Sequence, residues 1–194
     1  MRYRPGHKQR THGRIVAEAA AALRRDGVRG ATVERVMTRA GLSHGGFYAH
    51  FSSKDDMAAA GLAAAFAETR AALFGDLGDA TDEDWIHQVM ARYLGRAHRD
   101  AEDAGCPLPH LAGELARARG SLKHESEQGL EDYAAAISTR LAGGGSEGRS
   151  NAYALLALMV GGIALARVAA DPGLSDQILR ACRRVAQDLA AASS

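Results

Sequence analysis

Apolar positions recur with a helical period along most of the chain. Between Gly13 and Asp26 they return every three or four residues, and Gly27 follows where such a helix would end. Alanine dominates the apolar residues, while β-branched and aromatic residues are scarce, which favours helix over sheet. We therefore predict an all-α protein of about nine helices.

In the N-terminal part, the sequence pattern predicts four helices. The second begins at Thr32, whose side chain can cap it, and Gly41 then allows a sharp turn because it has no Cβ. A third, short helix starts after a capping Ser43, and Ser53 caps a long fourth helix that ends near Phe74. Two short helices joined by a tight turn form a helix-turn-helix, whose second helix fits a DNA major groove.

The third helix has an apolar back and a polar front. Phe47 and Phe51 are four residues apart, so they share one face and should pack as core against the preceding helix. His44, Gly45 and Tyr48 point elsewhere. This front is the candidate DNA-reading surface.

Charge separates the N-terminal part from the rest of the chain. Residues 1–55 hold eleven Lys and Arg against four Asp and Glu, although the whole chain has a net charge of only +1. The remaining 139 residues therefore carry six excess negative charges. Because phosphate attraction follows local positive charge, we expect residues 1–60 to be a DNA-binding domain, with residues 1–12 as a flexible basic arm.

Four motifs in this region resemble the TetR/AcrR family of bacterial repressors. They are Ala31-Thr-Val33, Ala40-Gly-Leu-Ser43, Tyr48-Ala-His-Phe51 and Ser53-Lys54, within about residues 13–60. The resemblance implies a homodimer that binds a palindromic operator and releases it when a small molecule enters the C-terminal domain. By position it implies DNA contacts from Thr32, Ser43, His44, Gly45, Gly46, Tyr48, His50 and Lys54. Gly46 departs from the pattern, because many relatives carry a side chain there.

Residues 61–194 are expected to form a helical domain that binds a ligand and dimerises. Its helices are predicted over about residues 84–102, 122–141, 147–170 and 174–192. A further short helix is expected between a break at residues 105–109 and about residue 119. Helical bundles hold ligands between their helices. The candidate pocket residues are Trp85, Val89, Tyr93, Cys106, Leu111, Tyr133 and Ile137. The alternative is that each of them is an ordinary core residue.

The last two helices are apolar over more of their surface than one core face needs. We expect them to build a two-fold dimer, in which Gly161 and Gly162 let a partner helix approach closely. The candidate interface residues are Tyr153, Leu156, Met159, Val160, Ile163, Ile178, Cys182 and Val185. Burial inside the monomer is the alternative.

A cytoplasmic location is expected. Residues 152–166 are all apolar or glycine, but fifteen residues rise only about 22 Å as a helix, short of a hydrocarbon core of about 30 Å. We therefore predict a buried helix there. The basic N-terminus has no apolar region of the kind a secretory signal needs, and the two cysteines form no CxxC motif.

Two other functions stay open. Cys106 lies at a chain break near His98 or His110, where an imidazolium would favour the thiolate, so a repressor that senses electrophiles or oxidants is the alternative. A helical-bundle enzyme is the more distant one, because the sequence has no repeated Glu-x-x-His pair, zinc-protease motif, nucleophile elbow or dinucleotide fingerprint. We expect no catalysis, cofactor or metal. The sequence does not identify the inducer, the operator, the regulated genes or the direction of regulation.

Overall fold

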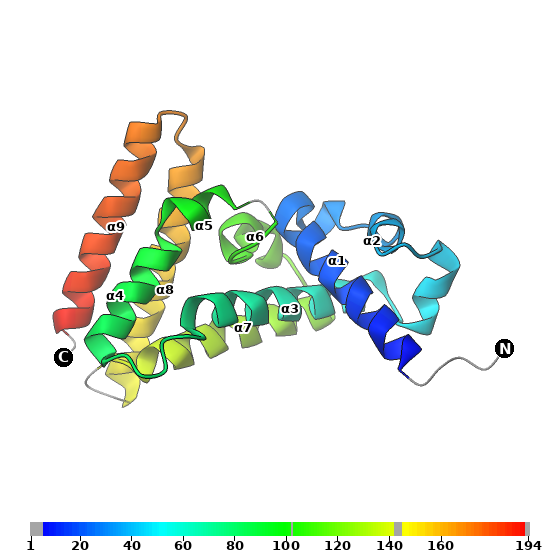
Figure 1. Cartoon of the computed structure of the whole chain (residues 1–194), viewed down its shortest axis with the longest axis horizontal. Helices are drawn as coiled ribbons and strands as arrows, with labels where there is room; N and C mark the ends of the chain where they lie inside the picture. Colours follow the sequence, from blue (N-terminus) through cyan, green and yellow to red (C-terminus); the bar gives the residue numbers. More distant parts are fainter. Residues whose placement is uncertain (1–5, 102, 142–144, 193–194) are drawn as a thin grey trace. The chain divides into compact units, whose positions relative to one another are not determined.

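The computed structural model describes residues 6–101, 103–141 and 145–192. Within these ranges the chain forms nine α-helices, one short 3-10 helix and no strand, which confirms the predicted fold class (Figure 1). The helices are α1 (His7–Gly30), α2 (Val33–Arg39), the 3-10 helix η1 (His44–Ala49), α3 (Lys54–Phe74), α4 (Asp82–Tyr93), α5 (Arg96–Asp100), α6 (Leu108–Leu115), α7 (Gly120–Ser138), α8 (Gly145–Val168) and α9 (Pro172–Ala192).

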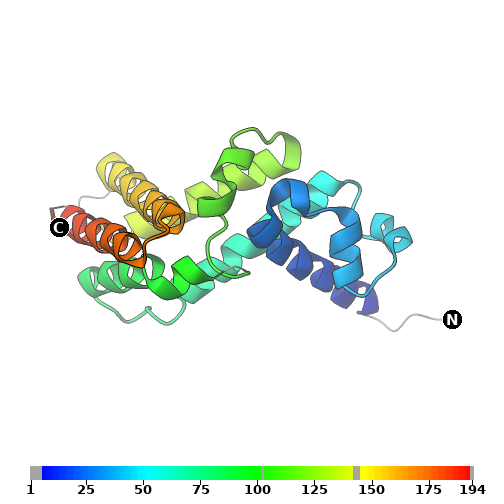
Figure 2. The same cartoon turned by 90° about the horizontal axis from the view of Figure 1, so that it is seen from above.

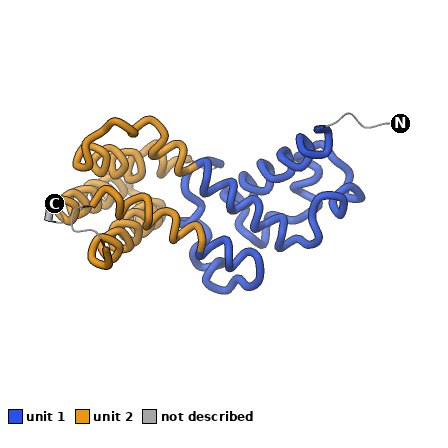
Figure 3. Tube along the Cα trace, turned by 90° about the horizontal axis from the view of Figure 1, so that it is seen from below, with its two compact units in different colours: residues 1–68, 102–127 blue, residues 69–101, 128–194 orange. Residues whose placement is uncertain are grey.

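The chain packs into two compact units (Figure 3). The first comprises residues 1–68 and 102–127, and the second comprises residues 69–101 and 128–194. Packing therefore divides the chain within α3, and it groups α6 with the N-terminal helices. We divided the chain by function instead, into a DNA-binding part, residues 1–60, and a ligand-binding and dimerisation part, residues 61–194. That division stays a prediction.

The first helix starts earlier than we expected. α1 begins at His7, after Gly6 in the left-handed conformation with φ of 85°, so the second half of the predicted flexible arm is helical. Thr11 is buried, which ties these turns to the first unit. Residues 1–5 lie outside the described ranges. The predicted end is confirmed, because Gly27 interrupts the helix with φ of 74°.

The core of the first unit forms where α1 packs against α2 and α6. Ile15, Leu23, Val36 and Phe66 are at most 1% exposed there. α3 approaches α1 closely at Gly61, where an added Cβ would lie 2.8 Å from the Cβ of Ala19.

Gly61→Ala is expected to lower the free energy of unfolding by about 1–3 kcal/mol, because the new methyl group would push α1 and α3 apart. Urea denaturation followed by circular dichroism measures this change. Gly113→Ala in α6 is the matched control, since an added Cβ meets nothing within 4 Å there. It should leave stability unchanged or raise it slightly through better helix propensity. Equal stability of the two variants would contradict the close approach.

The second unit is built around a pair of antiparallel helices. α8 and α9 run side by side in Figures 1 and 2, and α4 packs against α9. An added Cβ on Gly162 would lie 2.8 Å from Leu94 and 3.0 Å from the Sγ of Cys182, so this glycine serves packing within the protomer. Our expectation that Gly162 faces a partner helix was therefore wrong. Gly161 is open, with nothing within 4 Å of an added Cβ.

The helix predicted over residues 84–102 is broken in two. Thr81 caps α4 by accepting a hydrogen bond from the Asp84 amide at 3.2 Å, and α4 ends at Tyr93. Gly95 then takes an extended conformation and starts α5. The helical spacing of apolar residues continues past this position, but the helix does not, because glycine has low helix propensity.

Two helices, α3 and α8, are long and apolar enough to span a membrane by length and composition alone. This is weak evidence, because core helices of soluble proteins pass the same test, and the two helices do not indicate a membrane protein.

Candidate nucleic-acid interface

The helix-turn-helix is held by local hydrogen bonds. The Oγ1 of Thr32 accepts from the Arg35 amide at 3.3 Å and caps α2, as predicted. After α2, Gly41 has φ of 67° and its amide donates to the carbonyl of Thr38 at 3.0 Å. The predicted cap and turn are both confirmed.

Arg14 of α1 holds the same turn from outside. Its Nη2 donates to the carbonyl of Ala40, the residue directly before Gly41. An added Cβ on Gly41 would lie 3.0 Å from this nitrogen. Sequence reasoning missed Arg14, because nothing in the local pattern links positions 26 residues apart.

The helix expected to read DNA is a 3-10 helix, η1, instead of an α-helix. Ser43 occupies its N-cap position with extended backbone, but the side chain forms no capping hydrogen bond. A short helix therefore lies where we predicted it, but in the 3-10 form, and the predicted cap by Ser43 was wrong. Gly45 and Gly46 explain the difference, because two adjacent glycines strongly disfavour an α-helix and short 3-10 turns tolerate them.

The apolar back and polar front of this segment are as predicted. Phe47 is 2% and Phe51 7% exposed, and their rings stack with centroids 5.8 Å apart. Ser43, His44 and Gly45 are exposed and Gly46 is half-buried. Tyr48 is 73% exposed, while its ring meets the edge of Phe47 at 5.2 Å. An aromatic ring held against the core and open to solvent is suited to contact a nucleic acid.

Lys54 lies at the start of α3, beside the end of α1. Its Nζ donates to the carbonyl of Arg29 at 3.4 Å, three residues before the Thr32 cap. Ser53 caps α3 as predicted, since its Oγ accepts from the Asp56 amide at 3.0 Å. Thr32 is half-buried and Lys54 is exposed, so a phosphate could reach both the lysine and the start of α2.

His50 is half-buried at the end of η1. Its ring centroid lies 5.8 Å from that of His12, and its Nδ1 is buried without a hydrogen-bond partner in the described part of the chain. Burial, and then the nearby His12 and Lys8, hold the pKa of His50 below its usual range. His50 therefore stays neutral in the free protein more readily than an exposed histidine.

Helices α6 and α7 are tied to this unit by side chains that sequence reasoning also missed. The Oε2 of Glu114 in α6 accepts from the Arg29 amide at 3.2 Å. The Oγ of Ser121 donates to Asp56 at 2.9 Å, at the start of α7. Both contacts lie within the first unit and brace the two ends of the helix-turn-helix region.

The seven predicted ligand residues are all buried, at 0–4% exposure. Cys106 and Leu111 belong to the first unit, whereas Trp85, Val89, Tyr93, Tyr133 and Ile137 belong to the second. Burial suits both a core residue and the wall of an enclosed ligand site, so their role in ligand binding stays a prediction.

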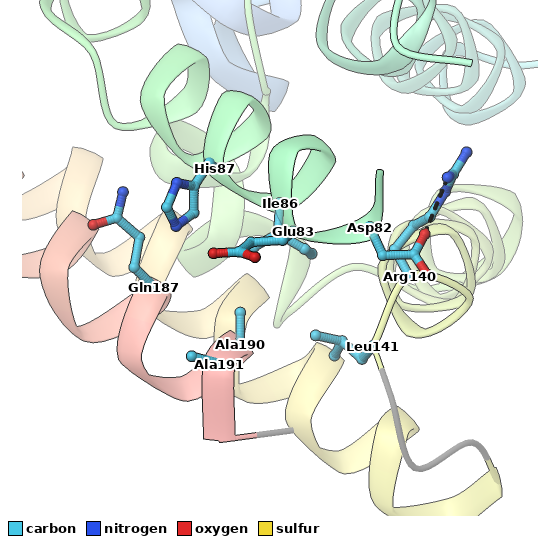
Figure 4. A pocket seen from close by; sticks show the side chains of 9 residues that line it. All are labelled: Asp82, Glu83, Ile86, His87, Arg140, Leu141, Gln187, Ala190 and Ala191. Carbon is cyan, nitrogen blue, oxygen red and sulfur yellow. Dashed lines mark hydrogen bonds and ion pairs between the residues drawn. The ribbon is translucent and has the colours of Figure 1, made fainter. Parts of the chain in front are cut away.

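One of these pockets, of about 260 Å³, lies between α4, the end of α7 and the end of α9 (Figure 4). Arg140 at its edge pairs with Asp82 at 3.1 Å and lies over the Trp85 ring at 5.7 Å from the centroid. Glu83 and His87 come from α4, and Gln187 faces them from α9. The lining thus combines these charged and polar side chains with four apolar ones, Ile86, Leu141, Ala190 and Ala191.

The predicted dimer residues divide into two groups. Leu156, Met159 and Ile163 are at most 3% exposed, so they pack inside the protomer, which is the alternative we left open. The other five are at least partly accessible: Tyr153, Val160, Ile178, Cys182 and Val185. The most exposed apolar residues of α8 are Leu165 and Val168, at 60% and 80%, and neither is among the candidate interface residues. The helical spacing of apolar residues does not show which apolar face is covered by other helices of the same chain and which is left exposed.

In the described ranges, no group of three His, Cys, Asp or Glu side chains could hold a metal ion.

Comparison with known proteins agrees with this geometry. The family model for bacterial regulatory proteins, tetR family, matches residues 15–60. Curated protein sequences gave no match.

Solved structures extend the likeness to almost the whole chain. A TetR transcriptional regulator from Chloroflexus aurantiacus is 23% identical, with 93% of this chain and 94% of that chain covered and a TM-score of 0.76. A TetR-family transcriptional regulator from Cytophaga hutchinsonii is 17% identical, with 99% and 98% covered and a TM-score of 0.80. The reduced form of E. coli NemR is 19% identical, with 92% and 96% covered and a TM-score of 0.76.

A helix-turn-helix with an exposed reading face, on an all-helical chain, defines a DNA-binding regulator of transcription. Residues 15–60 match the tetR family of bacterial regulatory proteins, and almost the whole chain has the fold of TetR-family regulators.

Proposed function

We propose that this chain is a cytoplasmic, homodimeric repressor that binds a palindromic operator and releases it when a small molecule binds residues 61–194. The exposed front of η1 carries the proposal. It presents His44 and Tyr48 on a core-packed segment, and Lys54 lies on the same basic unit. Phosphate contacts would supply affinity, and side chains on η1 would read base edges.

Selection from random DNA tests the operator directly. A dimer with two η1 segments should enrich a two-fold-symmetric sequence whose half-sites are about one helical turn apart. Lys54→Ala should weaken binding to all enriched sequences alike, because a phosphate contact carries no sequence information. Selection that enriches no sequence would contradict the proposal.

The dimer is supported by the apolar surface of α8. Only 39% of its most apolar stretch is buried within the protomer, and Leu165 and Val168 lie three residues apart on the exposed side. A second copy of the chain would cover this surface and place two reading segments on one side of a duplex.

Leu165→Glu combined with Val168→Glu is expected to dissociate the dimer at micromolar concentration, because it would bury two carboxylates in an apolar interface. Light scattering measures the mass. Leu130→Glu on α7, where the leucine is 38% exposed, is the matched control and should stay dimeric. A wild-type chain that is monomeric under these conditions would contradict the dimer itself.

The second unit is the proposed part for binding the releasing molecule. Trp85, Tyr93 and Tyr133 are buried there, and the Trp85 ring packs on Phe74 at 4.9 Å between centroids. Apolar, aromatic interiors of helical units are common ligand sites. We restrict the proposal to the five predicted residues of this unit and leave out Cys106 and Leu111. A metabolite screen in which no compound class both raises the melting temperature and releases DNA would contradict it.

The thiol-sensing alternative receives less support. Cys106 is 4% exposed, and reactive cysteines need access to the oxidant. NemR was solved in a reduced form, but at 19% identity the likeness shows the fold alone. If Cys106→Ser still releases DNA on oxidant treatment, the alternative fails. That the chain is no enzyme stays a prediction.

The pKa of His50 predicts how pH acts on DNA binding. The pKa is lowered in the free protein, and a DNA phosphate beside the ring would favour the protonated form. Binding would then take up a proton, so the added affinity should be fully present below the pKa of His50 in the free protein and be lost as pH rises through the higher pKa of the bound state. Binding isotherms from pH 5.5 to 8.5 measure this at fixed ionic strength.

His50→Asn should flatten the dependence. His12→Asn should move the pH range over which affinity changes to higher pH, because this substitution removes one of the charges that lower the pKa of His50. A pH dependence that is the same in His50→Asn and in the wild type would contradict this role.

A further inference from the structure

An arginine-lined pocket of about 380 Å³ lies in the second unit, apart from the residues predicted to bind a ligand. It forms where α4 gives way to α5 and both meet the first half of α9. Its lining is Leu94, Arg96, Asp176, Leu179, Arg180 and Arg183.

The one carboxylate of this lining is already neutralised. Asp176 accepts from the Nε of Arg96 at 2.8 Å and from its Nη2, and from the Nη1 of Arg99 at 3.3 Å. Both carboxylate oxygens are thus engaged, and the side chain of Asp176 is only 13% exposed. Its hydrogen bonds from Arg96 hold the pKa of Asp176 below its usual range, so it stays ionised and paired.

Arg180 and Arg183 have no such hydrogen-bonded partner, although the charge of Arg180 also helps to lower the pKa of Asp176. Neither makes an ion pair or a side-chain hydrogen bond within residues 6–101, 103–141 and 145–192. They lie three residues apart, so they share one face of α9. Three arginines against one aspartate give the lining a net charge of +2. Guanidinium groups gathered on one side of a pocket repel one another, and an anion between them would remove that repulsion.

We propose that this pocket binds a small dianion, of the phosphomonoester or dicarboxylate class. Two free guanidinium groups match two negative charges, and their planar donors suit the paired oxygens of a phosphate or carboxylate. Leu94 and Leu179, at 0% and 2% exposure, form an apolar wall that limits water around the bound charge. The proposal does not depend on DNA binding.

The pocket stays accessible in the proposed dimer. On α9, positions 176, 180 and 183 fall on one side of the helix at 100° per residue. The predicted interface positions 178 and 185 fall on the opposite side, while Cys182 packs against Gly162 of α8 within the protomer. A partner copy covering the second set would leave the first set open to solvent.

Isothermal titration at pH 7.5 and constant ionic strength tests the proposal, with inorganic phosphate, succinate and acetate as the probes. We expect one phosphate or one succinate per protomer, bound at least tenfold more tightly than the singly charged acetate. The relative affinity of phosphate and succinate tells which class of dianion the pocket prefers. Acetate binding as tightly as both dianions, or no dianion binding at millimolar concentration, would overturn the proposal.

Arg180→Ala combined with Arg183→Ala should weaken dianion binding at least tenfold. Arg184→Ala is the matched control, because this exposed arginine on the same helix does not line the pocket. Equal loss in control and double variant would show general charge attraction and overturn the site. Amide chemical shifts of the wild-type chain give a second readout that needs no variant: phosphate should move those of residues 94–96 and 176–183, and unchanged shifts there would also overturn it.

Discussion

Replacing Arg24 by methionine is expected to lower the free energy of unfolding by about 3 kcal/mol. The guanidinium is 6% exposed and uses all three nitrogens. It donates to the carbonyl of Gly105 at 2.9 Å, to the Oε2 of Glu68 at 2.7 Å and to the carbonyl of Ala65 at 2.9 Å. Hydrogen bonds from a charged donor are stronger than neutral ones, and methionine of similar length would replace none of them.

The neighbouring arginine provides the control. Arg25 pairs with Asp103 at 2.9 Å, but that carboxylate is 60% exposed. Exposed pairs contribute little, so Arg25→Met should lower the free energy of unfolding by less than about 1 kcal/mol. Urea denaturation of both variants measures the difference. Equal losses of unfolding free energy in the two variants would contradict this prediction. They would show that the hydrogen bonds from Arg24 to α3 and to the segment before α6 stabilise the fold no more than an exposed ion pair does.

Tyr48→Ala is expected to weaken operator binding by about 10- to 100-fold. One good base contact contributes about 1–3 kcal/mol of discrimination, and Tyr48 is the most exposed aromatic side chain of η1. Because Phe47 holds the ring in place, little conformational freedom is lost on binding. Fluorescence anisotropy with the selected operator measures the affinity.

Tyr48→Phe separates the ring from its hydroxyl group. If the hydroxyl donates to a base or phosphate, the phenylalanine variant should lose as much affinity as alanine; if the ring packs against DNA, it should bind almost like the wild type. His87→Ala, an exposed histidine of the second unit, should leave affinity unchanged. Wild-type affinity in Tyr48→Ala would contradict the reading face.

Local chemistry allowed much of the N-terminal unit to be predicted. The caps at Thr32 and Ser53 and the left-handed turn at Gly41 follow from residue type and spacing alone. The core positions Phe47 and Phe51 follow from their shared helical face. The motifs that carry the TetR resemblance are of this local kind, and the family match over residues 15–60 confirms it.

What could not be predicted depends on contacts between distant segments. The bonds of Arg14 to Ala40 and of Glu114 to Arg29 join positions with no common pattern. A count of apolar positions made Met159 look like an interface residue, although α8 buries it in its own protomer. The 3-10 form of η1 and the break at Gly95 show that apolar period alone cannot decide backbone conformation where glycines lie.

Footprinting on the DNA that flanks the coding region of this protein, titrated across salt, tests whether the chain binds an operator as a two-fold dimer. We expect a protected, two-fold-symmetric site, an affinity that falls steeply with salt, and loss of protection in both His44→Ala and Tyr48→Ala. A weak footprint without symmetry that both variants reproduce would contradict it, provided selection from random DNA also enriches no sequence.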